Sequence, residues 1–236
     1  YVARDDSTDP NAGGGVGHQH RVLWGRIAQG RVQEGDEIAV FPSGQTAFVA
    51  EVRHAGSTVG RCEAGQSAGV VLDRQVDVSR GDWLLALRSQ AAADVASSLA
   101  ATQGWNDVEV DAAGKQAWLN GRQEFQATLA WLDTEPAVPG RKYWVRHGHR
   151  WAQARISSIE HRLDIHSLAP QPAQQLGVNE IGQVRIQMQQ PLPILPYRHN
   201  RSAGALIIVD ATSNRTSGAL LVQGNEGRHE IEQAAA

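Results

Sequence analysis

The histidines are the residues of this chain most suited to metal binding or proton transfer. Six of the nine fall in three closely spaced pairs: His18 and His20, His147 and His149, His161 and His166. Histidines two residues apart share a face on a strand, as a shared ion would require. No cysteine or carboxylate at zinc-ligand spacing completes any pair. The pattern therefore favours solvated loop histidines, and we predict no metal site.

Carboxylates and glycines give no stronger case for catalysis. Asp77 with Asp82, and Asp133 with Glu135, have spacings that turns produce routinely. The run Gly13-Gly-Gly15 has no preceding strand and no following Gly-Lys-Ser/Thr, so it does not predict a phosphate loop. The Gly-x-Ser-x-Gly nucleophile motif is absent from the sequence. We predict no catalytic residue and no cofactor-binding residue in this chain.

A basic and aromatic stretch is the strongest candidate for binding. Residues 141–162 hold six basic side chains interleaved with Tyr143, Trp144 and Trp151. On a β-ribbon this composition suits single-stranded nucleic acid, but the net charge of −3 argues against such a partner. The alternatives are a solvated outer face and a docking surface for an acidic partner. The docking candidates, chosen on charge alone, are Arg141, Lys142, Arg146 and Arg201.

Length and composition set wide limits. The 236 residues suit one large domain or two small ones, and a hydrophobic content of 41% allows a buried core. The single cysteine, Cys62, excludes an internal disulfide and suits a reducing, cytoplasmic compartment. No apolar run approaches the roughly 18–20 residues of a membrane span, and no signal peptide is evident. Because Tyr1 is not methionine, we expect the sequence to begin inside a longer protein.

The sequence around these candidate residues predicts short strands. In the first half we predict strands at 22–28, 37–41, 47–53, 67–72 and 83–87, separated by Gly, Pro and Asp turn signals. Short strands at this spacing suggest a barrel or sandwich. Residues 5–20 are rich in Gly, Asp and Asn and predict a flexible loop. We assign residues 1–88 to a first β domain.

An alanine-rich segment interrupts the strands. Residues 90–103 predict a short amphipathic helix ending at Gly104, and residues 108–110 and 116–119 a small hairpin. We therefore place an insertion at 89–123, a second β domain at 124–222 and a polar tail at 223–236. Later strands are predicted at 181–188, 205–210 and 219–222, and residues 153–163 alternate only partly, which indicates a bend or bulge. Prolines 191, 193 and 196 argue against a central strand between them.

The segment from Tyr143 to Trp151 gives the most specific local prediction. If His147-Gly148 forms a two-residue turn, Trp144 lies directly across from Trp151. Such a cross-strand aromatic pair contributes roughly 0.2–1 kcal/mol and helps to fix the register.

Two sets of motifs, one in each half, carry a family resemblance. The first comprises residues 1–4, Arg21, 25–28 with Gly30, 35–36, 42–44, 64–66 and 77–82. The second comprises residues 127–129 with Trp131, 139–140, 163–165, Asn179-Glu-Ile-Gly182, Pro196-Tyr197 with Asn200-Arg201, and 214–216 with Gly218. Together they resemble domains II and III of translation-factor GTPases. More narrowly, they resemble the GTPase subunit of heterodimeric bacterial sulfate adenylyltransferase. The loop at 5–20, the insertion and Gln29, where the family often has serine, depart from its pattern.

The resemblance implies an all-β chain of two consecutive barrels of elongation factor Tu domain II and domain III type. In the family, a preceding domain binds GTP and Mg, and its hydrolysis drives a smaller catalytic subunit that makes adenylylsulfate from ATP and sulfate. Some members continue into an adenylylsulfate kinase. The resemblance therefore implies three partners: the catalytic subunit, the upstream GTPase domain and, in such members, the kinase. It implies no GTP residue within this chain.

Two other functions stay open at the level of sequence. The basic aromatic hairpin is compatible with a translation-factor-like RNA-binding module, whose binding would weaken steeply with salt. An autonomous β-barrel interaction module with no enzyme parent is the third hypothesis. A Gly-x-x-x-x-Gly-Lys-Ser/Thr motif encoded upstream of Tyr1 would separate the first two from the third.

Overall fold

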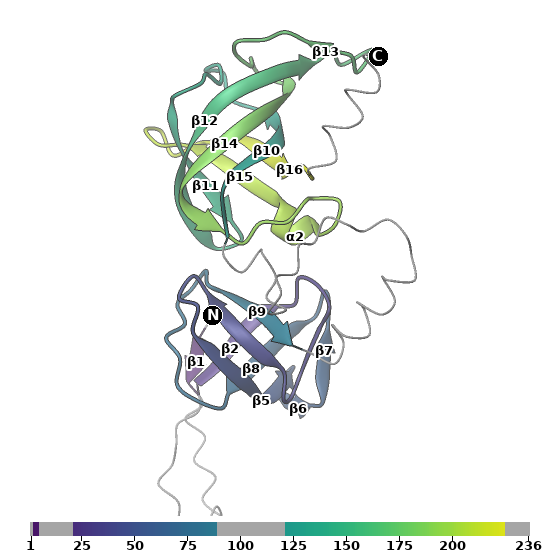
Figure 1. Cartoon of the computed structure of the whole chain (residues 1–236), viewed down its shortest axis with the longest axis vertical. Coiled ribbons are helices and arrows are strands. Elements are labelled where there is room, and N and C mark those ends of the chain that lie inside the picture. Colours follow the sequence, from purple (N-terminus) through teal and green to yellow (C-terminus); the bar gives the residue numbers. More distant parts are fainter. Residues whose placement is uncertain (1, 5–20, 89–120, 225–236) are drawn as a thin grey trace, which may run out of the picture. The chain divides into compact units, whose positions relative to one another are not determined.

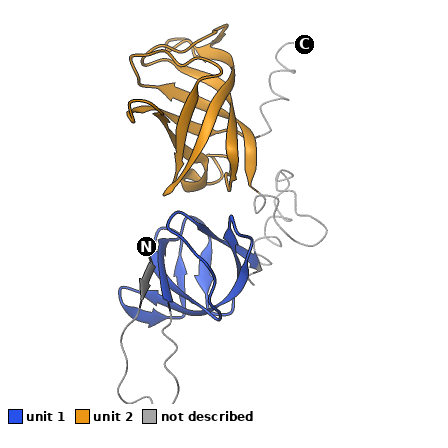
Figure 2. Cartoon of the chain, turned by 90° about the vertical axis from the view of Figure 1, so that its left-hand side faces the viewer, with its two compact units in different colours: residues 1–119 blue, residues 120–236 orange. Residues whose placement is uncertain are grey.

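The computed structural model describes residues 2–4, 21–88 and 121–224. The chain divides into two compact units, residues 1–119 and 120–236, which are coloured separately in Figure 2. Among the described residues every strand pairing is antiparallel, and the one helix has four residues. The all-β class predicted from the sequence is therefore confirmed.

The first unit is an open barrel, whose strands surround one core without a pairing between β1 and β9 among the described residues. Six strands follow one another in the order β1-β2-β8-β5-β4-β9, β6 pairs with β5, and β3 and β7 form a separate ribbon. Their bounds are β1 Val2–Arg4, β2 Arg21–Arg26, β3 Arg31–Gln33, β4 Glu37–Phe41, β5 Thr46–His54, β6 Ser57–Val59, β7 Arg61–Glu63, β8 Ser67–Leu72 and β9 Trp83–Arg88.

Alternation and turn chemistry explain this unit. Along the first half of β5, buried Ala47 and Val49 alternate with exposed neighbours, as expected of a strand with one face on the core. The turn from β4 to β5 places Gly44 at φ +71°, a conformation that glycine adopts without steric cost. Buried Cys62 on β7 belongs to the same core, so the ribbon packs onto the main sheet.

The second unit is a closed barrel, seen in the upper part of Figure 1. Its strands pair in the order β11-β15-β16-β10-β14-β12, and β12 pairs again with β11, which completes a six-strand ring. A short β13 extends the β12 edge. The bounds are β10 Arg122–Trp131, β11 Lys142–His147, β12 Arg150–Leu163, β13 Pro170–Gln171, β14 Ile181–Leu192, helix α2 Arg201–Gly204, β15 Ala205–Asp210 and β16 Thr216–Val222.

The interior of this barrel is filled by side chains from all six strands. Trp131 and Tyr143 are the largest fully buried residues, and their rings meet edge to face at 5.7 Å. Such aromatic pairs contribute about 0.5–1.5 kcal/mol beyond the area they bury. On β12, register shifts between Ile156 and Ser158 and between Ile159 and His161 confirm the predicted bulges. They bend the 14-residue strand so that it serves two neighbours.

Two local predictions are wrong. Trp144 pairs with Gln153, not with Trp151, because the two-residue turn is Gly148-His149, with Gly148 at φ +59°. Trp151 instead faces Arg146. The central strand β14 also includes Pro191, whose missing N–H is tolerated because the pairing of β14 with β12 ends at Met188.

The remaining strand predictions agree closely with the structure. The predicted 37–41, 67–72 and 205–210 coincide with β4, β8 and β15, and the others differ at their ends. The ribbon β3–β7 and helix α2 were not predicted. The loop at 5–20, the helix and hairpin of the insertion, and residues 225–236 of the tail lie outside the described residues. The domain bounds, including the insertion at 89–123, stay predictions.

Candidate functional site

Arg141, the first docking candidate, is held inside an ion-pair network. Its guanidinium donates to Glu135 Oε2 at 2.7 Å and to Asp210 Oδ2 at 2.6 Å, and it lies over the ring of Tyr143. Asp210 is almost fully buried, whereas about a third of the Arg141 side chain remains exposed. These contacts assign Arg141 a structural part in joining two loops of the barrel.

Lys142 and Arg146 lie together on the outer face of β11. Their positions alternate with buried Tyr143 and Val145, so both side chains point away from the core. The Arg146 guanidinium lies 5.7 Å from the ring centre of Trp151, within the range of a cation–π contact. Its Nε also donates to the carbonyl oxygen of Gly148 at 3.0 Å.

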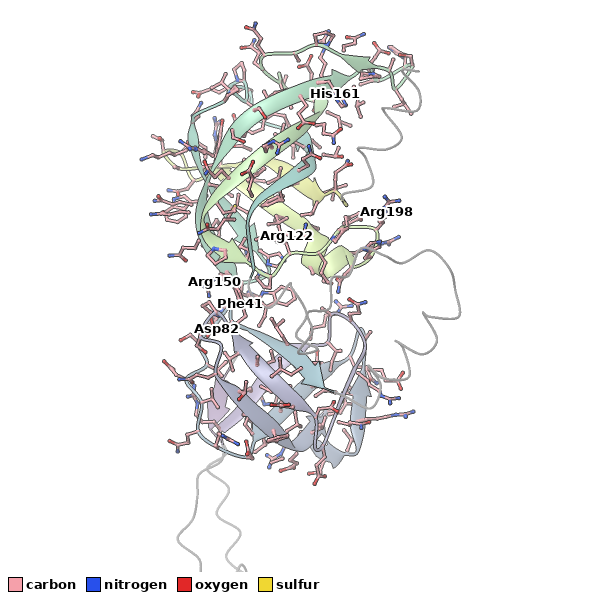
Figure 3. All side chains as sticks on the ribbon, in the orientation of Figure 1. Phe41, Asp82, Arg122, Arg150, His161 and Arg198 are labelled. Carbon is pink, nitrogen blue, oxygen red and sulfur yellow. The ribbon has the colours of Figure 1, made fainter. Side chains whose placement is uncertain are left out.

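Arg201 lies elsewhere, at the start of helix α2. Asn200 caps this helix, with its Oδ1 accepting the N–H of Ala203 at 3.0 Å. Arg198, labelled in Figure 3, marks the same end of the barrel. The four predicted residues therefore do not form one cluster: two share the face of β11, one is in an ion-pair network and one is on α2.

Several motifs of the second half lie at the opposite end from α2, which we call the ionic rim, whereas Pro196-Tyr197 and Asn200-Arg201 lie at the α2 end. The ionic rim consists of the loops 132–141, 164–180 and 211–215 with the strand ends that they join. There Glu180 accepts from the N–H of Gly177 at 2.7 Å and from Arg162 at 2.6 Å. Asn179 adopts φ +64°, and a Cβ on Gly182 would lie 2.7 Å from the carbonyl oxygen of His161. In the described structure the Asn-Glu-Ile-Gly motif therefore builds a turn and a close packing contact.

Two buried carboxylates complete the ionic rim. Asp133 accepts from Ser217 Oγ at 2.9 Å and from Arg215 at 3.2 Å, and the first of these bonds contributes most to lowering its pKa. Asp210 accepts from the N–H and Oγ of Ser213 and from Arg141. Backbone donation from Ser213 is the largest influence lowering the Asp210 pKa, to about 2. Carboxylates so fully bonded are ionised at neutral pH and are poor proton acceptors.

The described histidines do not come together. His147 is fully buried, with Nε2 at 3.0 Å from the carbonyl oxygen of Ala203, which identifies that nitrogen as the donor. Burial lowers its pKa to about 4. His161 lies toward the β13 end (Figure 3). Among residues 21–88 and 121–224, no group of three His, Cys, Asp or Glu could hold a metal ion.

Several motif residues of the first unit are likewise in turns. Gly30 and Gly35 adopt positive φ, and the N–H of Gly65 donates to the carbonyl oxygen of Ile27 at 2.8 Å. Asp82 accepts from the N–H of Ser79 at 2.8 Å and closes the turn before β9. The described part of the chain also holds no helix long and apolar enough to cross a membrane.

Sequence reasoning missed one arrangement on the outer face. The register places Lys142 opposite Arg155 and Arg146 opposite Trp151. Apolar Tyr143 and Val145 alternate with Lys142 and Arg146, and this pattern was enough to predict that the two basic side chains point outward. The register could not be read because the turn was placed one residue early.

The two units have the fold of domains II and III of translation-factor GTPases. Residues 124–223 match the family described as GTP-eEF1A C-terminal domain-like. The fold resembles that of crystal structures of sup35 complexed with GDP and with GMPPNP, with TM-scores of 0.65 and 0.64. The sequence identities to the two sup35 chains are 16% and 15%. Each match covers 86% of this chain. The matched parts make up 43% and 44% of the respective sup35 chains. The two-barrel fold of this class is the one predicted from the sequence.

The curated relatives give a more specific similarity than the fold does. The chain is 32% identical over 201 residues to the bifunctional enzyme CysN/CysC of Xylella fastidiosa, a match covering 85% of this chain and 28% of that protein. It is 31% identical to the bifunctional enzyme NodQ of Azospirillum brasilense over 91% of this chain and 29% of the relative. It is also 31% identical to sulfate adenylyltransferase subunit 1 of Rhizobium rhizogenes, over 88% and 36%. The chain is similar in sequence to sulfate adenylyltransferase subunit 1 proteins, the family that the motifs predicted, and spans about a third of their length.

Proposed function

We propose that this chain is the two-barrel part of a sulfate adenylyltransferase GTP-binding subunit. Its role is to relay the nucleotide state of a GTPase domain to a smaller catalytic subunit that forms adenylylsulfate from ATP and sulfate. The observation that carries this proposal is homology to sulfate adenylyltransferase subunit 1 over 88% of the chain. The described site residues favour a binding role over a catalytic one. Asp133, Asp210 and His147 are engaged in contacts that stabilise the fold, so they are poor candidates for proton transfer to a substrate.

The relay requires a rigid body that a neighbour can move. In the second unit the closed ring and the ionic rim fix the loops to the strands, so the barrel favours rigid-body displacement over internal rearrangement. Docking to the catalytic subunit through Lys142, Arg146 and Arg201 is part of the proposal. Arg141 contributes by holding the rim in shape.

Two measurements test the proposed function. First, titration calorimetry of the 236-residue chain with GTP and Mg should give no binding, and micromolar affinity would contradict the assignment of the nucleotide site to another domain. Second, the chain should co-elute in gel filtration with a sulfate adenylyltransferase catalytic subunit from the same source. Separate elution at micromolar concentrations of both proteins would contradict the docking role. A kinase fused to the parent protein is a further proposal, decided by the coding sequence downstream of Ala236.

A further inference from the structure

The outer face of the β11–β12 hairpin is a ladder of three directly opposed pairs. Lys142 faces Arg155, Trp144 faces Gln153 and Arg146 faces Trp151. We call these six residues the hairpin face. All six alternate with buried residues on their strands, so the whole set points outward from the barrel. The two strands are labelled in Figure 1.

The hairpin face places two like charges opposite each other. Lys142 and Arg155 are both exposed and occupy paired positions, an arrangement that destabilises an antiparallel ladder. Arg155 directs its guanidinium to the neutral Oε1 of Gln187, with Nε at 2.8 Å. Residues 136–159 contain no Asp or Glu, so the hairpin supplies no internal counter-charge.

Elsewhere in the same barrel, four arginines pair with carboxylates. Arg141, Arg162, Arg185 and Arg215 each lie within 3.4 Å of an Asp or Glu oxygen. Within the described residues, Lys142, Arg146 and Arg155 make no such ion pair. The cations of the hairpin face are therefore available to external carboxylates.

Aromatic surface accompanies the charge. Trp151 is 47% exposed, and Trp144 lies between the two cations of β11. Next to Arg146, on β15, Ile207 is 40% exposed. Tryptophan and arginine are the residues most enriched where protein interfaces derive their binding energy. The hairpin face thus combines unpaired positive charge with an apolar centre.

We propose that the hairpin face binds an acidic segment of a partner protein. Carboxylates of the segment lie against Lys142, Arg146 and Arg155, and an apolar side chain packs on Trp151 and Ile207. The segment does not join the sheet as an extra strand, because β11 is already paired on both sides, with β12 and β15. Recognition is therefore by side chains alone. This inference deepens the docking role proposed above for Lys142 and Arg146, on which it rests, by naming the chemistry of the segment that they bind.

The small number of cations favours a protein segment over a nucleic acid. Three cations span four residue steps of β11, roughly 14 Å, and the chain as a whole carries a net charge of −3. Nucleic-acid sites rely on several neutralised phosphates along a basic stripe or patch. Three isolated cations around two tryptophans match a few carboxylates better.

The test uses the 236-residue chain with ¹⁵N-labelled tryptophan and a twelve-residue peptide in which Glu alternates with Leu and Phe. We expect saturable shifts of the Trp144 and Trp151 indole N–H signals. Lys142→Glu should weaken binding by about tenfold, and Lys142→Gln by less. Arg61→Glu, in the first unit, changes the net charge equally and should leave binding within about twofold. The Arg61 side chain is 60% exposed.

Three results of the binding experiments would overturn the proposal. They are the absence of a saturable shift up to about 1 mM peptide, equal binding of a peptide with Gln in place of Glu, and tighter binding of a 20-nucleotide single-stranded RNA. Thermal unfolding provides a second, independent readout. Because Lys142 faces Arg155, Lys142→Glu should raise Tm by about 1–2 °C while it weakens binding. A lower Tm with unchanged peptide affinity would show that Lys142 serves the fold and would also overturn the proposal.

Discussion

At one end of the second barrel the chain is held by ionised carboxylates, and at the other by neutral polar groups. On the ionic rim, Asp133 and Asp210 bind arginines and backbone donors. At the α2 end, His147 and Asn200 bind the carbonyl oxygen and the N–H of Ala203. Both arrangements satisfy buried polar atoms, but they respond to different conditions. The stability contributed by the ionic rim depends on salt and is lost in strong acid, because its groups are charged. The stability contributed by His147 at the α2 end is lost in mild acid, because the buried imidazole is neutral.

The largest effect is expected on the ionic rim. Asp210→Ala removes a carboxylate that accepts from Thr212, Ser213 and Arg141. We expect a loss of about 4 kcal/mol in the free energy of unfolding, because a buried charged acceptor is removed and its donors are left without a partner. Urea unfolding at pH 7 measures this loss. Glu63→Ala, which breaks an exposed pair with Arg61, is the control and should cost less than about 0.5 kcal/mol. Equal losses for the two variants would contradict the structural assignment of Asp210.

The next effect separates the two ends by pH. The His147 pKa is lowered from 6.5 to about 4 by burial, so between these values only the unfolded chain gains a proton. Stability is therefore fully present above pH 6.5 and is lost as the pH falls to 4, by about 3 kcal/mol. The Asp210 pKa is lowered to about 2, so its contribution is present above its ordinary value of 3.8 and is lost only below that.

Urea unfolding at half-unit steps from pH 7 to pH 3 resolves these windows. His147→Gln should flatten the profile between pH 6.5 and 4 and leave the loss below pH 4. A profile with the same slope in the wild-type chain and the variant would show that another group titrates there.

A smaller effect is expected at the cap of α2. Asn200→Ala removes the acceptor for the Ala203 N–H and should cost about 1 kcal/mol. Asn200→Asp keeps an acceptor and should recover most of that loss. Thermal unfolding compares the three proteins, and equal losses in both variants would assign the role of Asn200 to contacts other than capping.

The smallest effect distinguishes the ends by salt. Arg215 is 62% exposed and pairs with buried Asp133 at 3.2 Å. Arg215→Gln should cost less than about 1 kcal/mol at low salt, and the loss should fade in 1 M NaCl because exposed charges are screened. The loss from Asn200→Ala should stay constant under the same conditions. A salt-independent Arg215→Gln effect would contradict the ionic description of the rim.

The sequence was most informative where local chemistry decides the structure. Strands such as β4 and β15 were predicted correctly because each is a short apolar run between turn signals, a pattern typical of a strand and too short for most helices. The motifs were also informative, since Asn179 and Gly182 are required by backbone geometry. Register and long-range pairing were harder. Because the predicted turn was one residue too early, Trp144 was predicted to lie opposite Trp151, whereas it lies opposite Gln153. The partners of Arg141 are 6 and 69 residues away, so charge alone could not reveal them.

The length of β12 has a mechanical consequence. The strand runs from Arg150, next to the α2 end, to Leu163 on the ionic rim, and along this path it is bonded first to β11 and then to β14. Because β12 is paired with both neighbours, displacing one end of the barrel relative to the other must break hydrogen bonds of β12 to β11 or to β14. The strand thus connects the Gly148 turn to the loops of the ionic rim through continuous pairing with β11 and then β14.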